Sequence, residues 1–266
     1  MEHPGFFERA GPFPLRAVAA AAEAKATDGV DPDLPIKDVR PLDSAGQGDK
    51  DYRQFAMHGV HVGGLLPLTP EMQQGGARPG WLGYIGVDDV DAYTEKVKAA
   101  GGRQFVAPTD IPGIGRFSCV CDPQGAVFML FKGNGEPDQA PPAPGTPGHI
   151  GWRELHAGEG VSAWDFYASQ FGWTKGEAMD MGPMGVYQLF ATGDAPVGGM
   201  MTKMPETPMP HWLYYINVDA IDAAIVRVSE AGGKVINGPM EVLGGMWIVQ
   251  GMDPQGAMFA LLASKR

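Results

Sequence analysis

The sequence is short of basic residues and of long apolar runs, and each shortage excludes a class of protein. Lys and Arg number 20 against 31 Asp and Glu, which gives a net charge of −11. Because phosphate binding depends on neutralisation by basic side chains, neither nucleic acid nor an acidic membrane surface is an expected partner. No apolar run reaches the length of a membrane span, and residues 1–25 lack the pattern of a signal peptide. The sequence therefore predicts a cytoplasmic protein.

Cysteine is also scarce. The chain has two, Cys119 and Cys121, which share one face of a predicted strand. Residues two apart are poorly placed to bridge each other, and a thiol-rich metal site needs more ligands than these two. We expect both to be small core residues in a reducing compartment.

The fingerprints of several enzyme classes are missing too, since no G-x-S-x-G, P-loop or dinucleotide-binding motif occurs. What is present describes a globular protein, with 44% hydrophobic and 19% charged residues. A chain of 266 residues is long enough for two domains of ordinary size. The 15 Met residues suit either core filling or the lining of an adaptable apolar pocket.

A repeated unit organises the chain. Residues of the segment 81–130 recur 131 positions later without a gap, so the chain holds two copies of one unit. The matching positions include Trp81 and Trp212, Tyr84 and Tyr215, Asp88 and Asp219, the Ala-Gly-Gly of 100–102 and 231–233, and the Asp-Pro-Gln-Gly-Ala of 122–126 and 253–257.

Each copy predicts a strand, a helix and two further strands. In the second copy the strand Leu213–Val218 is followed by Asp219, a side chain suited to capping the start of a helix. Apolar residues then recur at helical spacing, at Ile221, Ile225 and Val228. Gly232-Gly233 is typical of a helix end, and the turn 253–256 leads into the last strand.

The first fifty residues do not share this pattern. They predict an Ala-rich helix near 15–26 and a strand at Ile36–Val39, and they resemble the start of the N-acyltransferase that acts on UDP-acylglucosamine. The hexapeptide repeats of that enzyme's catalytic β-helix are missing here. We therefore expect neither acyl transfer nor uridine binding, and we interpret the segment as a displaced or fused fragment.

The second domain opens with a module that the first lacks: a strand Ile150–Leu155, a helix Ser162–Gln170 ended by Gly172, and strands through 187–192 and 197–201. We divide the chain into an acyltransferase-like fragment (1–50), a truncated domain (51–133), a linker (134–148) and a complete domain (149–266). The helix near 15–26 and the strand Ile36–Val39 are expected to fill part of the missing module. An edge left open would invite pairing with another chain, so a homodimer is a candidate.

The module motifs resemble those of a known family. Phe166-Tyr167 on the first helix, Phe171-Gly172-Trp173 after it, and the Asp-Pro-Gln-Gly turn are similar to the vicinal oxygen chelate superfamily, which includes glyoxalases, bleomycin-resistance proteins and extradiol dioxygenases. The resemblance covers about 51–266 and is strongest to tandem two-domain glyoxalase-like proteins of bacteria. It implies an α+β fold in which tandem βαβββ modules form curved mixed sheets, here with an incomplete first module in domain one.

The resemblance also implies where metal ligands would lie. Metal-dependent members place His, Gln or Glu on the cup face of their outermost strands. The corresponding positions here are Trp152, Leu213 and Ala260 in the second domain, with Leu82 and Met129 in the first. None of these side chains ligates a hard metal. We therefore expect no cofactor, and a divalent metal only through non-standard ligands.

Polar candidates lie beside those positions. Alternation puts Glu154 and His156 on the face of Trp152, and His211 and Tyr215 on the face of Leu213. If both faces line the cup, these four side chains could serve acid–base chemistry or an offset metal site. Alternatively, Glu154 is a hydrogen-bonded cup residue and both His lie at strand ends in solvent. Candidate pocket walls are Trp152, Leu213, Trp212, Trp81 and Tyr84, although packing alone also accounts for the repeated Trp pair.

Two functions from different classes follow. The first is a glyoxalase-like protein that binds a small apolar or aromatic molecule in a cup-shaped pocket without metal chemistry. The alternative is an enzyme that uses Glu154, His156 or His211, either a lyase or dioxygenase with a relocated metal or a metal-free hydrolase. A non-catalytic scaffold is a weaker third interpretation, because one fold hosts many functions.

Overall fold

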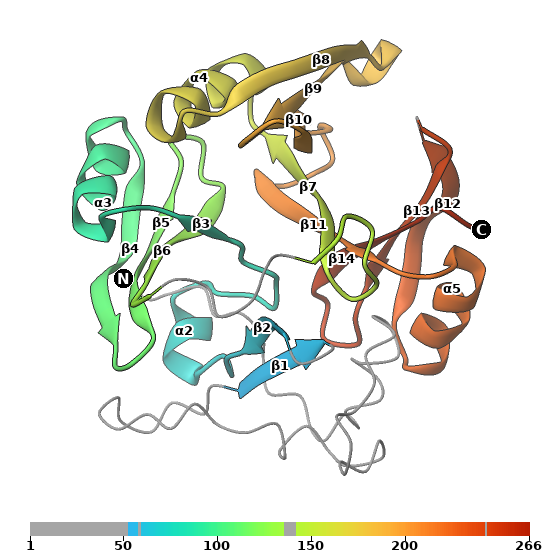
Figure 1. Ribbon diagram of the computed structural model, residues 1–266, viewed down its shortest axis with the longest axis horizontal. Helices are drawn as coiled ribbons and strands as arrows, with labels where there is room; N and C mark the ends of the chain where they lie inside the picture. Colours follow the sequence, from blue (N-terminus) through green and yellow to red (C-terminus); the bar gives the residue numbers. More distant parts are fainter. Residues whose placement is uncertain (1–52, 58–59, 136–141, 243) are drawn as a thin grey trace. The chain divides into compact units, whose positions relative to one another are not determined.

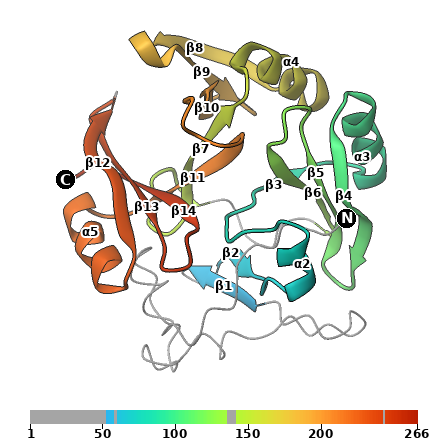
Figure 2. The ribbon, with the colours of Figure 1, turned by 180° about the vertical axis from the view of Figure 1, so that it is seen from behind.

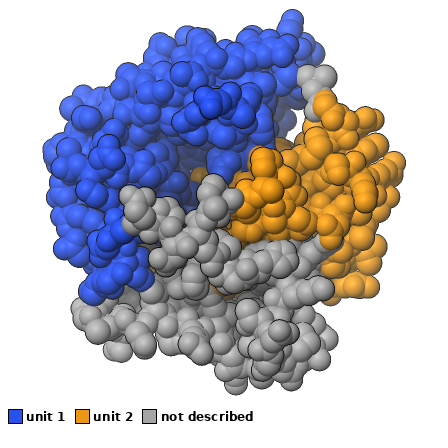
Figure 3. All heavy atoms as spheres, viewed as in Figure 1, with its two compact units in different colours: residues 1–3, 82–136, 152–213 blue, residues 4–81, 137–151, 214–266 orange. Residues whose placement is uncertain are grey.

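The structure is a computed structural model that describes residues 53–57, 60–135, 142–242 and 244–266. The chain forms two compact units, coloured separately in Figure 3. Unit 1 contains 82–135 and 152–213, and unit 2 contains the described residues of 53–81, 142–151 and 214–266. Unit 1 therefore contains both the first copy of the repeat and the opening module of the second domain, so it combines parts of the first and the second domain. The helix and strand predicted within 1–50 lie outside the described residues.

The first part of unit 1 is the first copy of the repeated unit. It runs β3 (Tyr84–Gly86), α3 (Val90–Ala99), β4 (Arg103–Ile111), β5 (Gly115–Cys121) and β6 (Val127–Gly133). The strands form a sheet in the order β3-β6-β5-β4, parallel between β3 and β6 and antiparallel elsewhere. Cys119 and Cys121 are free, and both are fully buried, as the sequence predicted.

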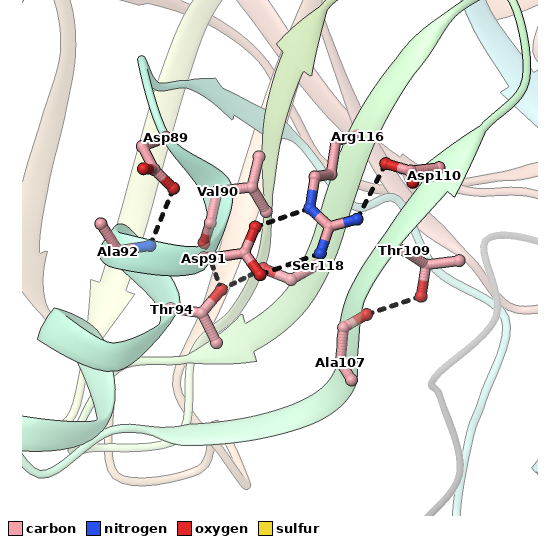
Figure 4. A network of polar contacts seen from close by, with 10 residues as sticks. All are labelled: Asp89, Val90, Asp91, Ala92, Thr94, Ala107, Thr109, Asp110, Arg116 and Ser118. Atoms are coloured by element: carbon pink, nitrogen blue, oxygen red, sulfur yellow. Dashed lines mark hydrogen bonds and ion pairs between the residues drawn. The ribbon is translucent and has the colours of Figure 1, made fainter.

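A polar network attaches α3 to the strands of this sheet (Figure 4). Arg116 on β5 donates Nε to Asp91 Oδ2 at 2.6 Å and Nη2 to Asp91 Oδ1 at 2.8 Å, and Nη1 to Asp110 Oδ1 at 2.8 Å. The hydrogen bonds from Arg116 lower the pKa of Asp91, so this carboxylate stays charged. Deeper in the unit, the hydroxyls of Thr94 and Ser118 lie 2.7 Å apart.

The second part of unit 1 is the opening module of the second domain. It runs β7 (Ile150–Ala157), α4 (Gly160–Phe171), β8 (Thr174–Asp180), a short 3₁₀ turn η2 (Gly182–Met184), β9 (Val186–Ala191) and β10 (Pro196–Thr202). Strand β10 pairs in parallel with β7 and antiparallel with β9, which pairs with β8. Gly172 ends α4 in the left-handed conformation at φ 69°, as predicted.

The turn Asp122-Pro123-Gln124-Gly125 joins the two parts of unit 1. Gln124 Nε2 donates to Glu159 O and Ser162 Oγ, both at 2.9 Å, and its Oε1 accepts from Glu159 N at 2.8 Å. Buried Asp122 accepts from the Tyr167 hydroxyl at 3.1 Å. The rings of Tyr93 on α3 and Phe171 on α4 stack nearby, and the two helices lie side by side (Figures 1 and 2). The turn of the first repeat therefore holds the first helix of the second domain.

Unit 2 contains the second copy of the repeat. It runs β11 (His211–Asn217, whose first three residues belong to unit 1), α5 (Ile221–Glu230), β12 (Lys234–Val242), β13 (Met246–Met252) and β14 (Met258–Ala263). The strand order is β12-β13-β14-β11. Helix α5 covers one face, where Ile221, Val228 and Leu261 are buried and Ile225 packs against them (Figure 1). The spacing of these apolar residues predicted that face.

One predicted helix cap is wrong. Helix α5 begins at Ile221, its N-cap is Ala220, and no side chain caps it. In the first repeat, α3 begins one residue later than expected as well, and Asp89 rather than Asp88 caps it by accepting from Ala92 N at 3.0 Å. Asp219 therefore precedes the cap, too far from the helix start for this role. The helix end is as predicted, with Gly232 at φ 82°.

The rest of unit 2 comes from the part of the first domain that precedes the repeat. Strands β1 (Arg53–Met57) and β2 (Val60–Leu65) form an antiparallel pair. The following segment contains a short helix α2 (Pro70–Gln74). Thr69 caps this helix by accepting from Met72 N at 3.2 Å.

Candidate functional site

Strand β7 presents different chemistry on its two faces. The face toward α4 carries Leu155 and Ala157, both fully buried, and the same side holds the aromatic stack of Trp173 and Phe190 against Tyr167 of α4. Because side chains alternate along a strand, Trp152, Glu154 and His156 lie on the opposite face.

Glu154 is the centre of the polar contacts on this face. Its side chain is buried, and its Oε2 accepts a hydrogen bond from the Tyr187 hydroxyl at 2.9 Å. Trp152 Nε1 in turn donates to the Tyr187 oxygen at 2.8 Å. A buried carboxylate needs such donors, because leaving one of its oxygens without a partner costs about 1–3 kcal/mol. Glu154 is therefore held in one orientation by residues from two strands.

Gly199 makes this contact possible. It lies on β10 between the other two strands, paired with Glu154 on β7 and with Leu189 on β9. A β-carbon at Gly199 would overlap the ring of Tyr187. The ring therefore crosses β10 in the space that glycine leaves, and its hydroxyl reaches Glu154.

Two histidines complete the group, which we call the Glu154 cluster: Trp152, Glu154, His156, Tyr187 and His211. His156 Nε2 lies 2.8 Å from Glu154 Oε1, an ion-pair distance, but its ring N–H is not aligned on that oxygen. The ring of His156 stacks on that of His211, with 4.8 Å between centroids and 5° between planes. The structure thus brings together three of the four predicted polar residues.

His211 is held as a neutral base. Its Nδ1 lies 3.2 Å from the Met209 carbonyl oxygen, which can only accept, so Nδ1 carries the hydrogen and Nε2 the lone pair. Burial, and then the neighbouring His156, lower the pKa of His211 below its ordinary 6.5. Nε2 of His211 and Nε2 of His156 are both buried, and neither makes a hydrogen bond within the described part of the chain.

The remaining predicted residues lie elsewhere. Trp212 packs edge-on against Tyr167 and Phe190 on the α4 side, and its Nε1 donates to the Tyr167 hydroxyl at 3.2 Å. Tyr84 is 45% exposed and contacts Phe131. In unit 2, Trp81 packs against the core under α5 and Tyr215 accepts from Gln250. Leu213 is buried on β11.

Tyr187 is the member of the Glu154 cluster that the sequence did not reveal. It comes from β9, more than thirty positions from Glu154, and no local pattern marks it. The signal available was the Gly198-Gly199 pair on the strand between them, because consecutive glycines inside a strand often mark the close approach of another group.

Comparison with known proteins identifies the family. A model of the Glyoxalase/Bleomycin resistance protein/Dioxygenase superfamily matches residues 149–261. A Mycobacterium tuberculosis protein named "Putative glyoxylase CFP32" is 34% identical over 217 residues, which cover 79% of this chain and 79% of that protein. The chain belongs to the glyoxalase superfamily.

Two further proteins are similar, one in sequence and one in fold. The Streptomyces peucetius anthracycline biosynthesis protein DnrV is 33% identical over 209 residues, covering 78% of this chain and 74% of that protein. The solved 2,2',3-trihydroxybiphenyl 1,2-dioxygenase of Sphingomonas wittichii strain RW1 is similar in fold, with a TM-score of 0.58 at 12% identity over 94% of this chain and 84% of its own. The predicted α+β fold is confirmed.

The acyltransferase resemblance is partial. A UDP-3-O-acylglucosamine N-acyltransferase of Methylobacterium nodulans is 40% identical over 63 residues, covering 24% of this chain and 18% of that protein. So short a match does not extend to the function of that enzyme.

The metal used by some members of the glyoxalase superfamily does not fit the residues present. Trp152, Leu213 and Ala260 offer no hard donor atom at the expected ligand positions. The Glu154 cluster does not replace them, because two imidazoles in parallel planes cannot both point an in-plane lone pair at one ion. Among the described residues, no group of three or more His, Cys, Asp or Glu is placed to hold a metal.

None of the helices that the structure describes is long and apolar enough to cross a membrane.

Proposed function

We propose that this glyoxalase-like protein binds a small aromatic molecule carrying a hydroxyl group, at the Glu154 cluster and without a metal. The observation that carries the proposal is the pair of buried Nε2 atoms on His156 and His211. A buried polar atom without a partner is unfavourable, and a donor on a ligand relieves it. The neutral His211 ring offers a lone pair to an O–H group.

The surroundings favour an aromatic ligand. The half-buried indole of Trp152 and the stacked imidazoles supply flat rings beside these nitrogens. The Streptomyces peucetius relative takes part in anthracycline biosynthesis by its name, and anthracyclines are polycyclic aromatic molecules. A phenol-like ligand would stack on these rings and donate one hydrogen bond from its hydroxyl group.

The test compares 2-naphthol with naphthalene by isothermal titration calorimetry. A hydrogen bond to His211 is worth about 1 kcal/mol, so 2-naphthol should bind about fivefold more tightly than naphthalene. His211→Phe keeps a flat ring but removes Nε2, and it should abolish that preference. His149→Phe, the same change just before β7, is the matched control. Equal binding of both compounds to the unchanged protein, or a preference that survives in His211→Phe, would overturn the proposal.

A second candidate is a metal-free hydrolase, which the Glu154–His156 pair and the neutral His211 favour. A neutral imidazole with a free lone pair is the usual general base near neutral pH. We would measure hydrolysis of 2-naphthyl acetate above the rate in buffer, in the unchanged protein and in His211→Phe. A rate equal to that in buffer, or unaffected by His211→Phe, would exclude His211 as the base.

A further inference from the structure

A row of four residues crosses the sheet of unit 2. Tyr215 on β11 pairs with Ala260 on β14, Ala260 with Gln250 on β13, and Gln250 with Asn237 on β12. Residues paired directly across neighbouring strands point to the same face. These four, which we call the amide row, therefore share one face of the sheet.

Hydrogen bonds run along the amide row. Gln250 Nε2 donates to the Tyr215 hydroxyl at 3.0 Å, and Asn237 Nδ2 donates to Gln250 Oε1 at 3.2 Å. The first of these bonds spans β14, which is possible because the residue between them is Ala260. The small side chain leaves room for the amide to pass above it. Gln250 is thus fixed at both ends of its amide group.

The face that carries the amide row also carries Asn217, paired with Leu262, and Lys234, paired with Met252, and the residues nearest the row are apolar. The opposite face carries the core under α5, including Val249 and Leu261. Alternation and register place a set of half-buried or exposed apolar residues around the row, namely Ile248, Met252, Met258, Leu262 and Met240. Asn237 is exposed and Gln250 is half-buried, so the Gln250 amide is the one partly shielded from water by these apolar neighbours.

The first repeat shows the same row without the amides. At the positions 131 residues earlier, Tyr84 pairs with Met129, Met129 with Cys119 and Cys119 with Val106, in the same register. Met129 and Cys119 are buried. The fold is therefore built equally well with apolar residues in this row. The amides of the second repeat are not required by the architecture.

We propose that Gln250 is the hydrogen-bond donor of a binding site for an uncharged, carbonyl-bearing apolar molecule, such as a ketone or quinone. An amide NH₂ carries two hydrogens, and the bond to Tyr215 uses one of them. The second hydrogen meets no acceptor among the described residues and suits a carbonyl oxygen. The methionines around the row suit an apolar body of variable shape. This proposal does not depend on the Glu154 cluster, which offers acceptors rather than a donor.

The first repeat supplies the variant for the test. The triple change Asn237→Val, Gln250→Cys, Ala260→Met places the row of the first repeat into the second, where the register already accommodates it. Gln250→Leu is a single change that removes the donor, and Gln73→Leu on α2 is the matched control. Circular dichroism and thermal unfolding establish that each variant is folded.

Binding is measured by calorimetry with 2-acetonaphthone and with 2-ethylnaphthalene, which lacks the carbonyl. The unchanged protein and Gln73→Leu should both bind the ketone about fivefold more tightly than 2-ethylnaphthalene, because one hydrogen bond contributes about 1 kcal/mol. Gln250→Leu and the folded triple variant should bind both compounds equally. Absence of a ketone preference in the unchanged protein, or its survival in Gln250→Leu, overturns the proposal.

Discussion

His156 and His211 stack with their ring centroids 4.8 Å apart and their planes within 5° of parallel, although they come from β7 and β11. The arrangement has two chemical consequences. The lone pairs lie in separate planes, so the two rings do not chelate one ion. The neighbouring His156 also helps to lower the pKa of His211.

The first prediction concerns pH. Burial and His156 lower the pKa of His211 below 6.5, so the unfolded chain takes up this proton at a higher pH than the folded one. The free energy of unfolding should therefore fall as the pH drops from about 7 through 6.5, until the folded pKa is reached. His211→Asn, which keeps a donor for the Met209 carbonyl, should lessen that pH dependence. Urea unfolding between pH 5 and 8 measures this pH dependence. If the free energy of unfolding changes equally with pH in both proteins, the lowered pKa of His211 is contradicted.

The second prediction concerns the Tyr187 hydroxyl. Tyr187→Phe removes a donor to the buried Glu154 side chain and the acceptor of the half-buried Trp152 Nε1. The free energy of unfolding should fall by about 1–3 kcal/mol. Tyr93→Phe is the matched control, since the described structure gives its hydroxyl no hydrogen bond and its ring stacks on Phe171. Equal effects of the two changes would show that the Tyr187 contacts contribute little.

The third prediction concerns the glycine beneath that ring. Gly199→Ala forces Tyr187 away from Glu154, because the new methyl group overlaps the ring. We expect a loss of about 1–3 kcal/mol in stability, typical of overpacking, together with weaker binding of 2-naphthol. Gly193→Ala, at a site with open space, should change neither. Chemical denaturation measures the stability, and calorimetry measures the binding. If a folded Gly199→Ala protein binds 2-naphthol as tightly as the unchanged protein, Tyr187 does not contribute to the site.

The fourth prediction concerns Asp122, which accepts from Gln124 N, Ala126 N and the Tyr167 hydroxyl. Burial raises its pKa above 3.8, so its contribution to stability falls as the pH rises through the range between 3.8 and the raised value. Asp122→Asn keeps the acceptor oxygen and avoids the buried charge, and it should lower stability by less than about 1 kcal/mol at pH 7.

Asp122→Ala, by contrast, removes the acceptor from two backbone N–H groups and a tyrosine. It should lower the free energy of unfolding by about 2–3 kcal/mol. Urea unfolding of both variants at pH 7 separates the hydrogen bonds from the charge. If Asp122→Asn and Asp122→Ala lower the free energy of unfolding equally, the negative charge of Asp122 itself stabilises unit 1.

Much of the fold was predictable because its signals are local. The spacing of Ile221, Ile225 and Val228 predicted the buried face of α5, and Gly172 and Gly232 predicted two helix ends. The repeat at 131 positions predicted that α3 and α5 occupy equivalent places. The error at Asp219 has a local cause as well, because adjacent residues at a strand-to-helix junction compete for the capping position.

The site was predictable in part. Alternation along one strand placed Glu154 and His156 together, and the position of His211 at the start of β11 suggested its convergence with them. Tyr187 was not predictable, because its contact with Glu154 depends on the order of strands β7, β10 and β9 and on the gap at Gly199. Trp212 was assigned to a pocket wall, whereas its ring packs with Tyr167 beneath α4. The side of a strand on which an isolated tryptophan lies depends on a register that one residue alone does not set.

Gln124 of the first repeat binds the start of α4 in the second domain, and unit 1 combines residues from both sides of the linker. We therefore expect that neither half folds as a separate protein. Severing the chain between 134 and 148 would give two fragments that each lack part of a shared interior. Produced together, they should reassemble, and produced alone, the first should be insoluble. Loss of either half of the chain would therefore remove residues from both compact units.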